Sequence, residues 1–515
     1  MSKLIIAEKP SVAKSIASAL GASSRADGFY EGNGLLVSWC VGHLVSPMDA
    51  GGYDERFKKW RYDDLPILPE PFRYVLAPGK EDAFENLCAL MDRPDVDTII
   101  NACDAGREGE LIFRLVYEMA GCRKPVLRLW ISSMEDSAIR EGFSDLRPGA
   151  DYEALYQSAL CRQKADWLVG INATRLFSVL YHRTLNVGRV QTPTLAMLAE
   201  RDAKITLFHK EKYHLLRLTL DGTEAVSEKF TDPTEAEQAA VMCKGAAVTC
   251  TSVTKEQKKE QPPKLYDLTT LQREANRLFG YTAKQTLDYA QSLYEKKLLT
   301  YPRTDSRYLT SDMAETASCV IHLAAKLPPF DGCSNFFPLV EAMLSDKEVS
   351  DHHAIIPTME IEKANIKALP LGERNLFLLV CCKLLCASAE PYVYEAVTAT
   401  FDCGGQSFTA KGKRILSEGW REIDRIFRAF LKEKPADGDG DTLPDFTEGQ
   451  TFDGAEVAVT EHFTQPPKPY TEDTLLSAME NAGKDDIPDE AERKGLGTPA
   501  TRAAIIEKLV AAGFV

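Results

Sequence analysis

Hydrophobic and polar positions follow two different periods along residues 1–152. Short runs of β-branched and other apolar residues are typical of buried strands, and three of them cover residues 4–7, 35–40 and 98–103. Residues 10–20 repeat apolar side chains on one helical face, with Pro10 suited to the first turn and Gly21 to the stop. This alternation of strands and helices predicts α/β units around a mostly parallel sheet.

The pattern changes several times in the rest of the chain. The changes are a helical pattern at residues 153–210, strand alternation at 213–222 and 245–254, and a hairpin at 394–415. Gly404 and Gly405 supply the hairpin turn, and the polar run at residues 255–264 predicts a linker. Because strands lie on both sides of a helical insert, we expect them to form one discontinuous domain.

Capping signals mark helix ends in the middle and at the end of the chain. Two capping boxes are predicted, Thr269 with Gln272 and Thr282 with Gln285. A helix stop at Gly280 lies between them, so a helix–turn–helix leads into the segment "LLTYPRTDSRYL", residues 298–309. The last helix begins at Thr498 and the chain stops at Val515, from which we expect a C-terminal truncation.

Composition and charge limit the classes of function. A chain of 515 residues exceeds the ~250 to 300 residues of one core, so two to four domains are expected. No apolar run approaches the ~20 residues of a membrane span, and we expect no membrane segment. The net charge of −15 restricts any nucleic-acid contact to a local basic lining. Thirteen cysteines without a CxxC pair indicate buried thiols in a reducing cytoplasm, not a zinc site.

Acidic residues gather where the predicted parallel strands end. Asp104, Glu108 and Glu110 follow the strand at residues 98–103, and Glu8 follows the first strand. Ligands bind at this edge of open α/β sheets. Converging carboxylates repel one another unless a divalent cation such as Mg²⁺ neutralises them, which indicates a magnesium site for phosphate chemistry. The alternative is that the two glutamates are helix-N-terminal acids favoured by the macrodipole.

The segment around Tyr301 places a phenol beside cationic side chains. A tyrosine hydroxyl with its pKa near 10 is a poor nucleophile at pH 7, and ionising it costs about 4 kcal/mol. A cation such as Arg303 or Lys9 would lower that cost and stabilise a charged phosphoryl transition state. The alternative is that Tyr301 is a half-buried aromatic residue beside a surface turn. The sequence contains no GxxxxGK[ST] run, so ATP is not demanded.

Seven motifs in a fixed order carry a resemblance to a known family. They are "AEKPSVAK", "VGHLVSP", "CDAGREGELIFR", "VGRVQTPTLAMLAERD", "PPKLYDLTTLQREANRLFGYTAKQTLDYAQSLYEKKLLTYPRTDSRYL", "DHHAIIPT" and "KGLGTPATRAAIIEKLVAAGFV". Together they extend along nearly the whole chain. On these motifs the chain resembles the type IA DNA topoisomerases and is most similar to their topoisomerase III branch.

The resemblance implies roles for individual residues. Tyr301 matches the nucleophile that attacks single-stranded DNA to leave a 5′-phosphotyrosine and a free 3′-hydroxyl. Arg303 matches the arginine that grips the scissile phosphate, and His352 a histidine near that phosphate. Glu8 matches the acid that protonates the leaving 3′-oxygen, with Lys9 as the lysine beside it.

The same resemblance implies a metal site and a DNA path. Asp104 and Glu108 match the first and last acids of a DxDxE motif whose middle position is Gly106 here, a gap that Glu110 could partly fill. We therefore expect one Mg²⁺ ion, which positions the phosphate and supports religation. Residues expected along the single-strand path or bracing the nucleophile are Arg189, Gln191, Arg162, Lys164, Thr304, Asp305, Ser306, Arg307 and Arg502.

The family fold is a four-domain torus that combines an α/β Toprim domain with helical and β-rich domains. The expected domains are Toprim at 1–152, a helical base at 153–210 and 462–515, a β-rich arch at 211–268 and 390–461, and a helical tyrosine domain at 269–389. The implied protein is a monomer of the cytoplasm and nucleoid that acts on single-stranded and underwound DNA without ATP. Two alternatives stay open, a Toprim phosphotransferase of the primase or nuclease kind and a catalytically idle DNA clamp.

Overall fold

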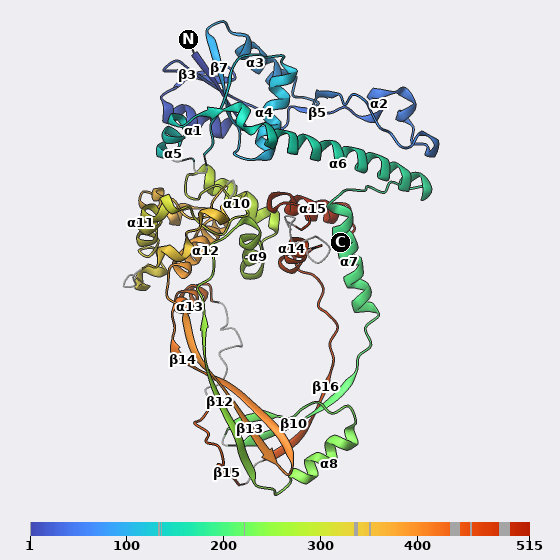
Figure 1. Ribbon diagram of the computed structural model, residues 1–515, viewed down its shortest axis with the longest axis vertical. Coiled ribbons are helices and arrows are strands. Elements are labelled where there is room, and N and C mark those ends of the chain that lie inside the picture. The colour runs from blue at the N-terminus through green and yellow to red at the C-terminus, as the bar shows by residue number, and fades with distance from the viewer. Residues whose placement is uncertain are drawn as a thin grey trace.

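The chain path of the computed structural model forms a ring (Figure 1). An α/β domain lies at one end and a β-rich arch at the other, with two groups of helices between them. The predicted toroidal arrangement is therefore confirmed. The structure describes residues 2–131, 134, 136–220, 222–333, 338–349, 352–432, 443–453, 456–483 and 495–515. Asp351 and Lys494, which begin two of the matched motifs, lie outside these residues.

The α/β domain is built on a mixed sheet. Among the described residues its strand order is β2-β3-β4-β1-β7-β8-β9, and the four strands β4, β1, β7 and β8 are parallel. The strands are β1 (Ser2–Ala7), β2 (Ser24–Ala26), β3 (Phe29–Gly32), β4 (Leu35–Trp39), β7 (Val96–Ala102), β8 (Val126–Arg128) and β9 (Arg147–Pro148). The helices are α1 (Pro10–Leu20), α3 (Glu81–Asp92), α4 (Arg107–Met119) and α5 (Asp136–Ser144). The predicted parallel pairing is confirmed for these four strands, whereas the outer strands β2, β3 and β9 are antiparallel to their neighbours.

Strand register places two acidic residues at one edge of this sheet. Ala7 of β1 pairs with Ala102 of the neighbouring parallel strand β7. Because parallel strands end on the same side, Glu8 and the loop that carries Asp104 leave the sheet next to each other. An extension with β5 (Val45–Pro47), α2 (Ala50–Tyr53) and β6 (Tyr74–Leu76) projects from the domain beside α6 (Glu153–Leu180) (Figure 1).

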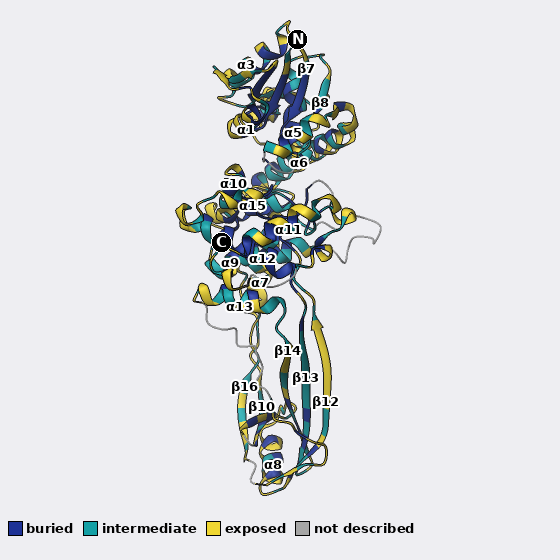
Figure 2. Cartoon of the chain, turned by 90° about the vertical axis from the view of Figure 1, so that its left-hand side faces the viewer, coloured by how far each residue is buried: buried dark blue, intermediate teal, exposed yellow. Residues whose placement is uncertain are grey.

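The arch is an antiparallel sheet with strand order β15-β12-β13-β14-β11-β10-β16 in the described chain. Its elements are β10 (Lys212–Leu220), β11 (Thr223–Val226), α8 (Pro233–Cys243), β12 (Val248–Glu260), β13 (Tyr392–Cys403), β14 (Gln406–Ser417), β15 (Thr451–Phe452) and β16 (Glu456–Phe463). The linker predicted at residues 255–264 is wrong for residues 255–260, because these continue β12 and pair with β13 as far as Glu260 with Tyr392. Figure 2 shows this end of β12 exposed. Cross-strand hydrogen bonds hold such a ribbon together without an apolar pattern. The prediction failed here because it relied on that pattern.

Helices lie between the α/β domain and the arch (Figure 1). The base contributes α6, α7 (Gln191–Thr206), α14 (Glu472–Asn481) and α15 (Pro499–Ala511). The tyrosine-bearing part contributes α9 (Leu268–Phe279), α10 (Ala283–Glu295), α11 (Ala314–Ala324), α12 (Leu371–Ala387) and α13 (Trp420–Phe430). Its core surrounds α12, which Figure 2 shows as largely buried. Helix α13 packs Ile423 and Phe427 into that core, although its residues lie within the predicted arch segment 390–461.

Helix boundaries agree with the capping signals in part. Thr282 and Gln285 form the predicted reciprocal box at the start of α10. The box predicted between Thr269 and Gln272 is wrong, because Asp267 caps α9 and both of these residues are buried inside the helix. Asp267 is itself a strong N-cap residue, and the acid two residues upstream was the better candidate. Within the described residues, no helix is long and apolar enough to cross a membrane.

Candidate active site

Tyr301 lies at the junction of the α/β domain and the tyrosine-bearing helices. Its hydroxyl donates a hydrogen bond to Asp104 Oδ2 at 2.8 Å, and its side chain is buried. The ring packs edge-on against Tyr294 at 5.3 Å and near His352 at 4.5 Å between centroids. Tyr294 and Tyr301 belong to the same apolar cluster as Ile5 of the α/β sheet. The phenol is thus inserted into the opposite domain.

The loop that presents Tyr301 is held by its own domain. Thr300 donates its hydroxyl to the carbonyl of Ala354 at 3.2 Å and accepts from the amide of Ile356 at 3.0 Å. Thr304 donates its hydroxyl to the carbonyl of His352 at 2.9 Å. These bonds tie the loop after α10 to residues 352–357, so Tyr301 and His352 reach the interface as one unit.

Glu8 combines burial with a close acidic neighbour. Its pKa is raised to about 7, first by burial and then by the nearby carboxylate of Asp104. The nearby cations Lys9 and Arg303 lower this pKa and only partly offset the rise. A carboxyl group that holds a proton near neutral pH is suited to act as a general acid.

The groups around the phenol favour its neutral form in this closed arrangement. Burial raises the pKa of Tyr301 well above its ordinary value, Asp104 adds to the rise, and Arg303 opposes it. Arg303 has a buried Nε that makes no hydrogen bond within the described chain. A buried guanidinium N–H without a partner is suited to a phosphate oxygen. His352 is buried and its Nε2 contacts the carbonyl of Ala105; burial lowers its pKa.

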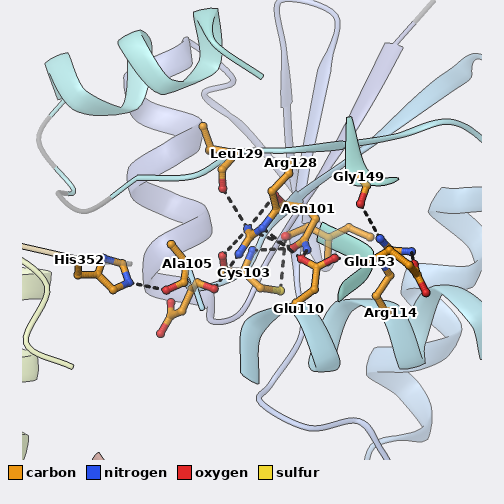
Figure 3. A network of polar contacts seen from close by, with 12 residues as sticks. Asn101, Cys103, Ala105, Glu110, Arg114, Arg128, Leu129, Gly149, Glu153 and His352 are labelled. Carbon is orange, nitrogen blue, oxygen red and sulfur yellow. Dashed lines mark hydrogen bonds and ion pairs between the residues drawn. The ribbon is translucent and has the colours of Figure 1, made fainter. Parts of the chain in front are cut away.

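Two of the four predicted metal ligands lie together. Glu8 and Asp104 are close enough for Asp104 to raise the pKa of Glu8, whereas the Glu108 side chain is 58% exposed and lies 3.8 Å from His43 Nε2. Both carboxylate oxygens of Glu110 are engaged elsewhere, by Asn101, Arg114 and Arg128 (Figure 3). No three Asp, Glu, His or Cys side chains in the described ranges form a cluster able to hold a metal ion. The adjacent carboxylate pair still fits Mg²⁺, which typically takes one or two carboxylates with waters and phosphate oxygens.

Four of the residues expected along a DNA path lie in the base, where they differ in exposure and in partners. Arg189 forms a bidentate pair with Asp166, at 2.6 Å from Nε and 3.2 Å from the second nitrogen, and Arg162 lies 4.0 Å from the same carboxylate. Lys164 lies over the Phe72 ring at 5.8 Å. Gln191 is buried at the start of α7. The two arginines therefore share one surface of the base.

The remaining predicted residues brace the fold. Ser306 donates its hydroxyl to the carbonyl of Glu348 at 2.8 Å, and Arg307 donates Nε to the carbonyl of Leu265 at 3.1 Å. With Thr304 they hold the tyrosine loop, whereas Asp305 is exposed. Arg502 is buried and donates to Thr269 Oγ1 at 2.8 Å, which links α15 of the base to α9 of the tyrosine domain.

Sequence reasoning missed three residues that shape the site. Gly109 of α4 lies so close to the Asp104 backbone that an added Cβ would be 2.1 Å from its carbonyl oxygen. Arg128 and Asn101 are buried polar residues in strands β8 and β7. Each had a visible signal, a glycine in the first turn of a helix or a single polar residue in an apolar strand run.

Comparisons with known proteins agree over the whole chain. The Toprim domain family matches residues 3–134, and the family described as DNA topoisomerase matches residues 150–515. The DNA topoisomerase 3 of Bacillus subtilis (strain 168) is 41% identical over 529 residues, covering 99% of this chain and 72% of the relative. That of Bacillus licheniformis is 41% identical over 530 residues with the same coverage. The solved structure of full-length topoisomerase I from Thermotoga maritima superposes with a TM-score of 0.73 at 25% identity, covering 99% of this chain and 78% of that chain.

The close approach of Gly109 to the Asp104 backbone predicts a large effect of one methyl group. Gly109→Ala should lower the free energy of unfolding by roughly 1–3 kcal/mol, because the clash is with backbone that cannot rotate away. Urea denaturation measures the change. Gly170→Ala in α6 is the matched control, since its Cβ would meet nothing nearer than 3.7 Å and alanine favours a helix by about 1 kcal/mol. Equal stability of the two variants would contradict the packing described here.

Burial of His353 predicts a loss of stability in mild acid. Burial is the main cause that lowers its pKa from 6.5 to about 4, against a 2.8 Å contact with the carbonyl of Ala354. The unfolded chain binds this proton below pH 6.5 and the folded chain does not, so stability falls as the pH drops from 6.5 to about 4. Over this range the free energy of unfolding falls by about 3 kcal/mol. In urea titrations His353→Asn should remove this part of the pH dependence, with the two proteins compared at pH 7.5 as the reference. An unchanged acid slope in the variant would refute the prediction.

Proposed function

Because the chain belongs to the type IA DNA topoisomerases, we propose that Tyr301 is the residue through which it breaks and rejoins a DNA strand. The observation that carries this assignment is the 2.8 Å hydrogen bond between the Tyr301 hydroxyl and Asp104 across the domain junction. It places a potential nucleophile beside the acids at the carboxyl end of the sheet. The matches to both family domains disfavour a Toprim phosphotransferase, and the assembled groups around Tyr301 disfavour an idle clamp.

The proposed cleavage exchanges one phosphate ester for another. The phenol oxygen of Tyr301 bonds to the phosphorus, and the bond from phosphorus to the 3′-oxygen breaks. The phenol proton leaves toward Asp104, with which it already shares a hydrogen bond, and the leaving 3′-oxygen takes a proton from Glu8. Arg303 directs its unpartnered Nε to the phosphate, supported by Lys9 and the neutral His352. The reverse steps reseal the strand. No ATP is consumed, because each step replaces one phosphate ester with another.

A divalent metal is typical of Toprim domains, and we assign Mg²⁺ to Glu8 and Asp104 with Glu108 at the exposed side of the pair. Bound there, it would supply positive charge for the scissile phosphate. Glu110 is left out of this assignment because its oxygens bond to Asn101, Arg114 and Arg128. The DNA-facing groups we propose are Arg162, Lys164 and Arg189 on the base, with Asp305 beside the tyrosine. Gln191 is left out of this set because it is buried at the start of α7.

Strand passage requires the tyrosine domain to leave the α/β domain. Among the described residues, the polar contacts of the closed junction include Tyr301 with Asp104 and Lys297 with Asp136 at 2.5 Å. The tyrosine domain also contacts the base, through Arg273 with Asp473 at 2.7 Å and Arg502 with Thr269. We propose that these contacts break while Tyr301 holds one DNA end, so that a second strand enters the ring. The enzyme would act as a monomer on single-stranded or underwound DNA at the nucleoid, in relaxation or decatenation.

Replacement of the nucleophile tests the assignment. Tyr301→Phe should abolish the covalent adduct with a 3′-labelled single-stranded oligonucleotide, because a 5′-phosphotyrosine leaves the label attached to the protein. Denaturing gels detect the adduct. Tyr294→Phe is the matched control, since it removes a neighbouring buried hydroxyl and keeps the ring contact, and it should still form the adduct. A covalent adduct with the Tyr301→Phe protein would exclude the proposal.

Removal of the metal should separate cleavage from resealing. With EDTA, the labelled adduct should still form, because the side chains named above supply attack and leaving-group protonation. Resealing to a strand with a free 3′-hydroxyl should fall at least about tenfold, because the phosphate is then poorly aligned. The measurement is the fraction of adduct converted to ligated product, with Mg²⁺ restored as the control. Equal resealing in EDTA and Mg²⁺ would argue against this metal role.

A further inference from the structure

A buried arginine grips the loop that carries Asp104. The side chain of Arg128, at the end of β8, has no solvent exposure. Its Nη1 donates to the carbonyl of Cys103 at 2.7 Å (Figure 3). Its Nη2 donates to the carbonyl of Asp104 at 2.8 Å. Further bonds reach the carbonyls of Leu129 at 3.0 Å and Asn101 at 3.1 Å. One guanidinium therefore joins the ends of strands β7 and β8 to the loop.

Glu110 is the counter-ion that allows this arginine to be buried. Its Oε2 lies 3.3 Å from Arg128 Nε and accepts a hydrogen bond from Asn101 at 2.8 Å. Its Oε1 accepts from Arg114 Nε at 2.9 Å. Glu110 is 1% exposed, and an uncompensated charge at such a site is strongly unfavourable. The first turn of α4 is thereby tied to Arg128, and through it to the loop.

The gripped loop is the part of the α/β domain that meets the tyrosine domain. Asp104 accepts from the Tyr301 hydroxyl, and the next carbonyl, that of Ala105, contacts His352. The amide of Cys103 is fixed by Asn101 Oδ1 at 3.0 Å, so the same network holds both ends of the turn. A shift of the loop would move both contacts of the closed junction together.

We propose that Arg128 and Glu110 are a positioning pair, which contacts no DNA but sets the backbone of Asp104 and Ala105 so that Tyr301 meets its phosphate in line. The inference rests on the proposed role of Tyr301. It gives Glu110 a role other than the metal ligation first expected of it. A buried ion pair is weak support for stability alone, but four carbonyl contacts from one guanidinium specify a backbone geometry.

Two substitutions around the same carboxylate separate positioning from stability. Arg128→Lys keeps the positive charge but cannot reproduce the fork that spans the carbonyls of Cys103 and Asp104. Arg114→Gln is the matched control, because Arg114 also pairs with Glu110, while its other contacts are with Glu153, the carbonyl of Gly149 and the ring of Tyr156, away from the Asp104 loop. Each variant of the full chain is assayed for oligonucleotide affinity, for the single-turnover rate of adduct formation and for its thermal midpoint.

The proposal expects Arg128→Lys to slow adduct formation about 10- to 100-fold while oligonucleotide affinity stays within threefold, since misplacement by about 1 Å can cost that much. Arg114→Gln should keep the wild-type rate even where it lowers the thermal midpoint equally. A wild-type rate for Arg128→Lys, or an equal loss of rate in both variants, would overturn the proposal.

A second variant covers the case in which Arg128→Lys does not fold. Glu110→Gln keeps the size of the side chain and removes the counter-charge, and it should slow adduct formation with unchanged affinity. A folded Glu110→Gln protein with the wild-type rate would overturn the proposal. Adduct mapping to Tyr301 in the wild-type protein is independent of either result, so failure here is distinguishable from failure of the proposed nucleophile.

Discussion

The hydrogen bond between the Tyr301 hydroxyl and the Asp104 carboxylate joins two groups 197 residues apart in the chain. Everything else at the site is arranged so that this contact can form. Parallel pairing of β1 and β7 brings Glu8 and Asp104 to one edge of the sheet. The turn after α10, tied to residues 352–357, carries Tyr301 and His352 to the same edge from the other domain.

Burial of this contact has two opposite consequences. In a low dielectric, the charged forms of Tyr301 and Glu8 are disfavoured, so the phenol is kept neutral and the pKa of Glu8 is raised to about 7 in the closed protein. The same surroundings strengthen the field of any cation at the site, whether Arg303 or a metal ion. A phosphate bound there would meet a protonated acid and an unpartnered guanidinium N–H, which are the groups that a departing 3′-oxygen and a charged transition state require.

The two sides of the junction differ in how firmly they are held. On the α/β side, the loop is fixed by Arg128 and Glu110 within the buried core. On the other side, polar contacts such as Lys297 with Asp136 connect the tyrosine-bearing helices to the α/β domain. A firmly held acid-bearing loop fits the proposed mechanism, in which the tyrosine domain leaves and must return to the same geometry after each opening.

The sequence by itself determined the local features of this protein. Strand and helix periods predicted the parallel core of the α/β sheet, capping chemistry predicted the start of α10, and ordered motifs identified the family. These succeed because they depend on neighbours a few residues apart. Local reasoning failed at residues 255–260, where pairing with β13 replaces apolar patterning, and at α13, whose partner core lies elsewhere in the chain.

Only the tertiary structure decided which acids act together. Asp104, Glu108 and Glu110 follow one another closely in the sequence, yet one faces Tyr301, one is largely exposed near His43 and one is enclosed by Arg128, Arg114 and Asn101. The direction of each side chain is set by a helix that begins between them and by partners that come from distant segments. Spacing along the chain carries no information about those partners, because burial and charge pairing arise only when the strands and helices pack.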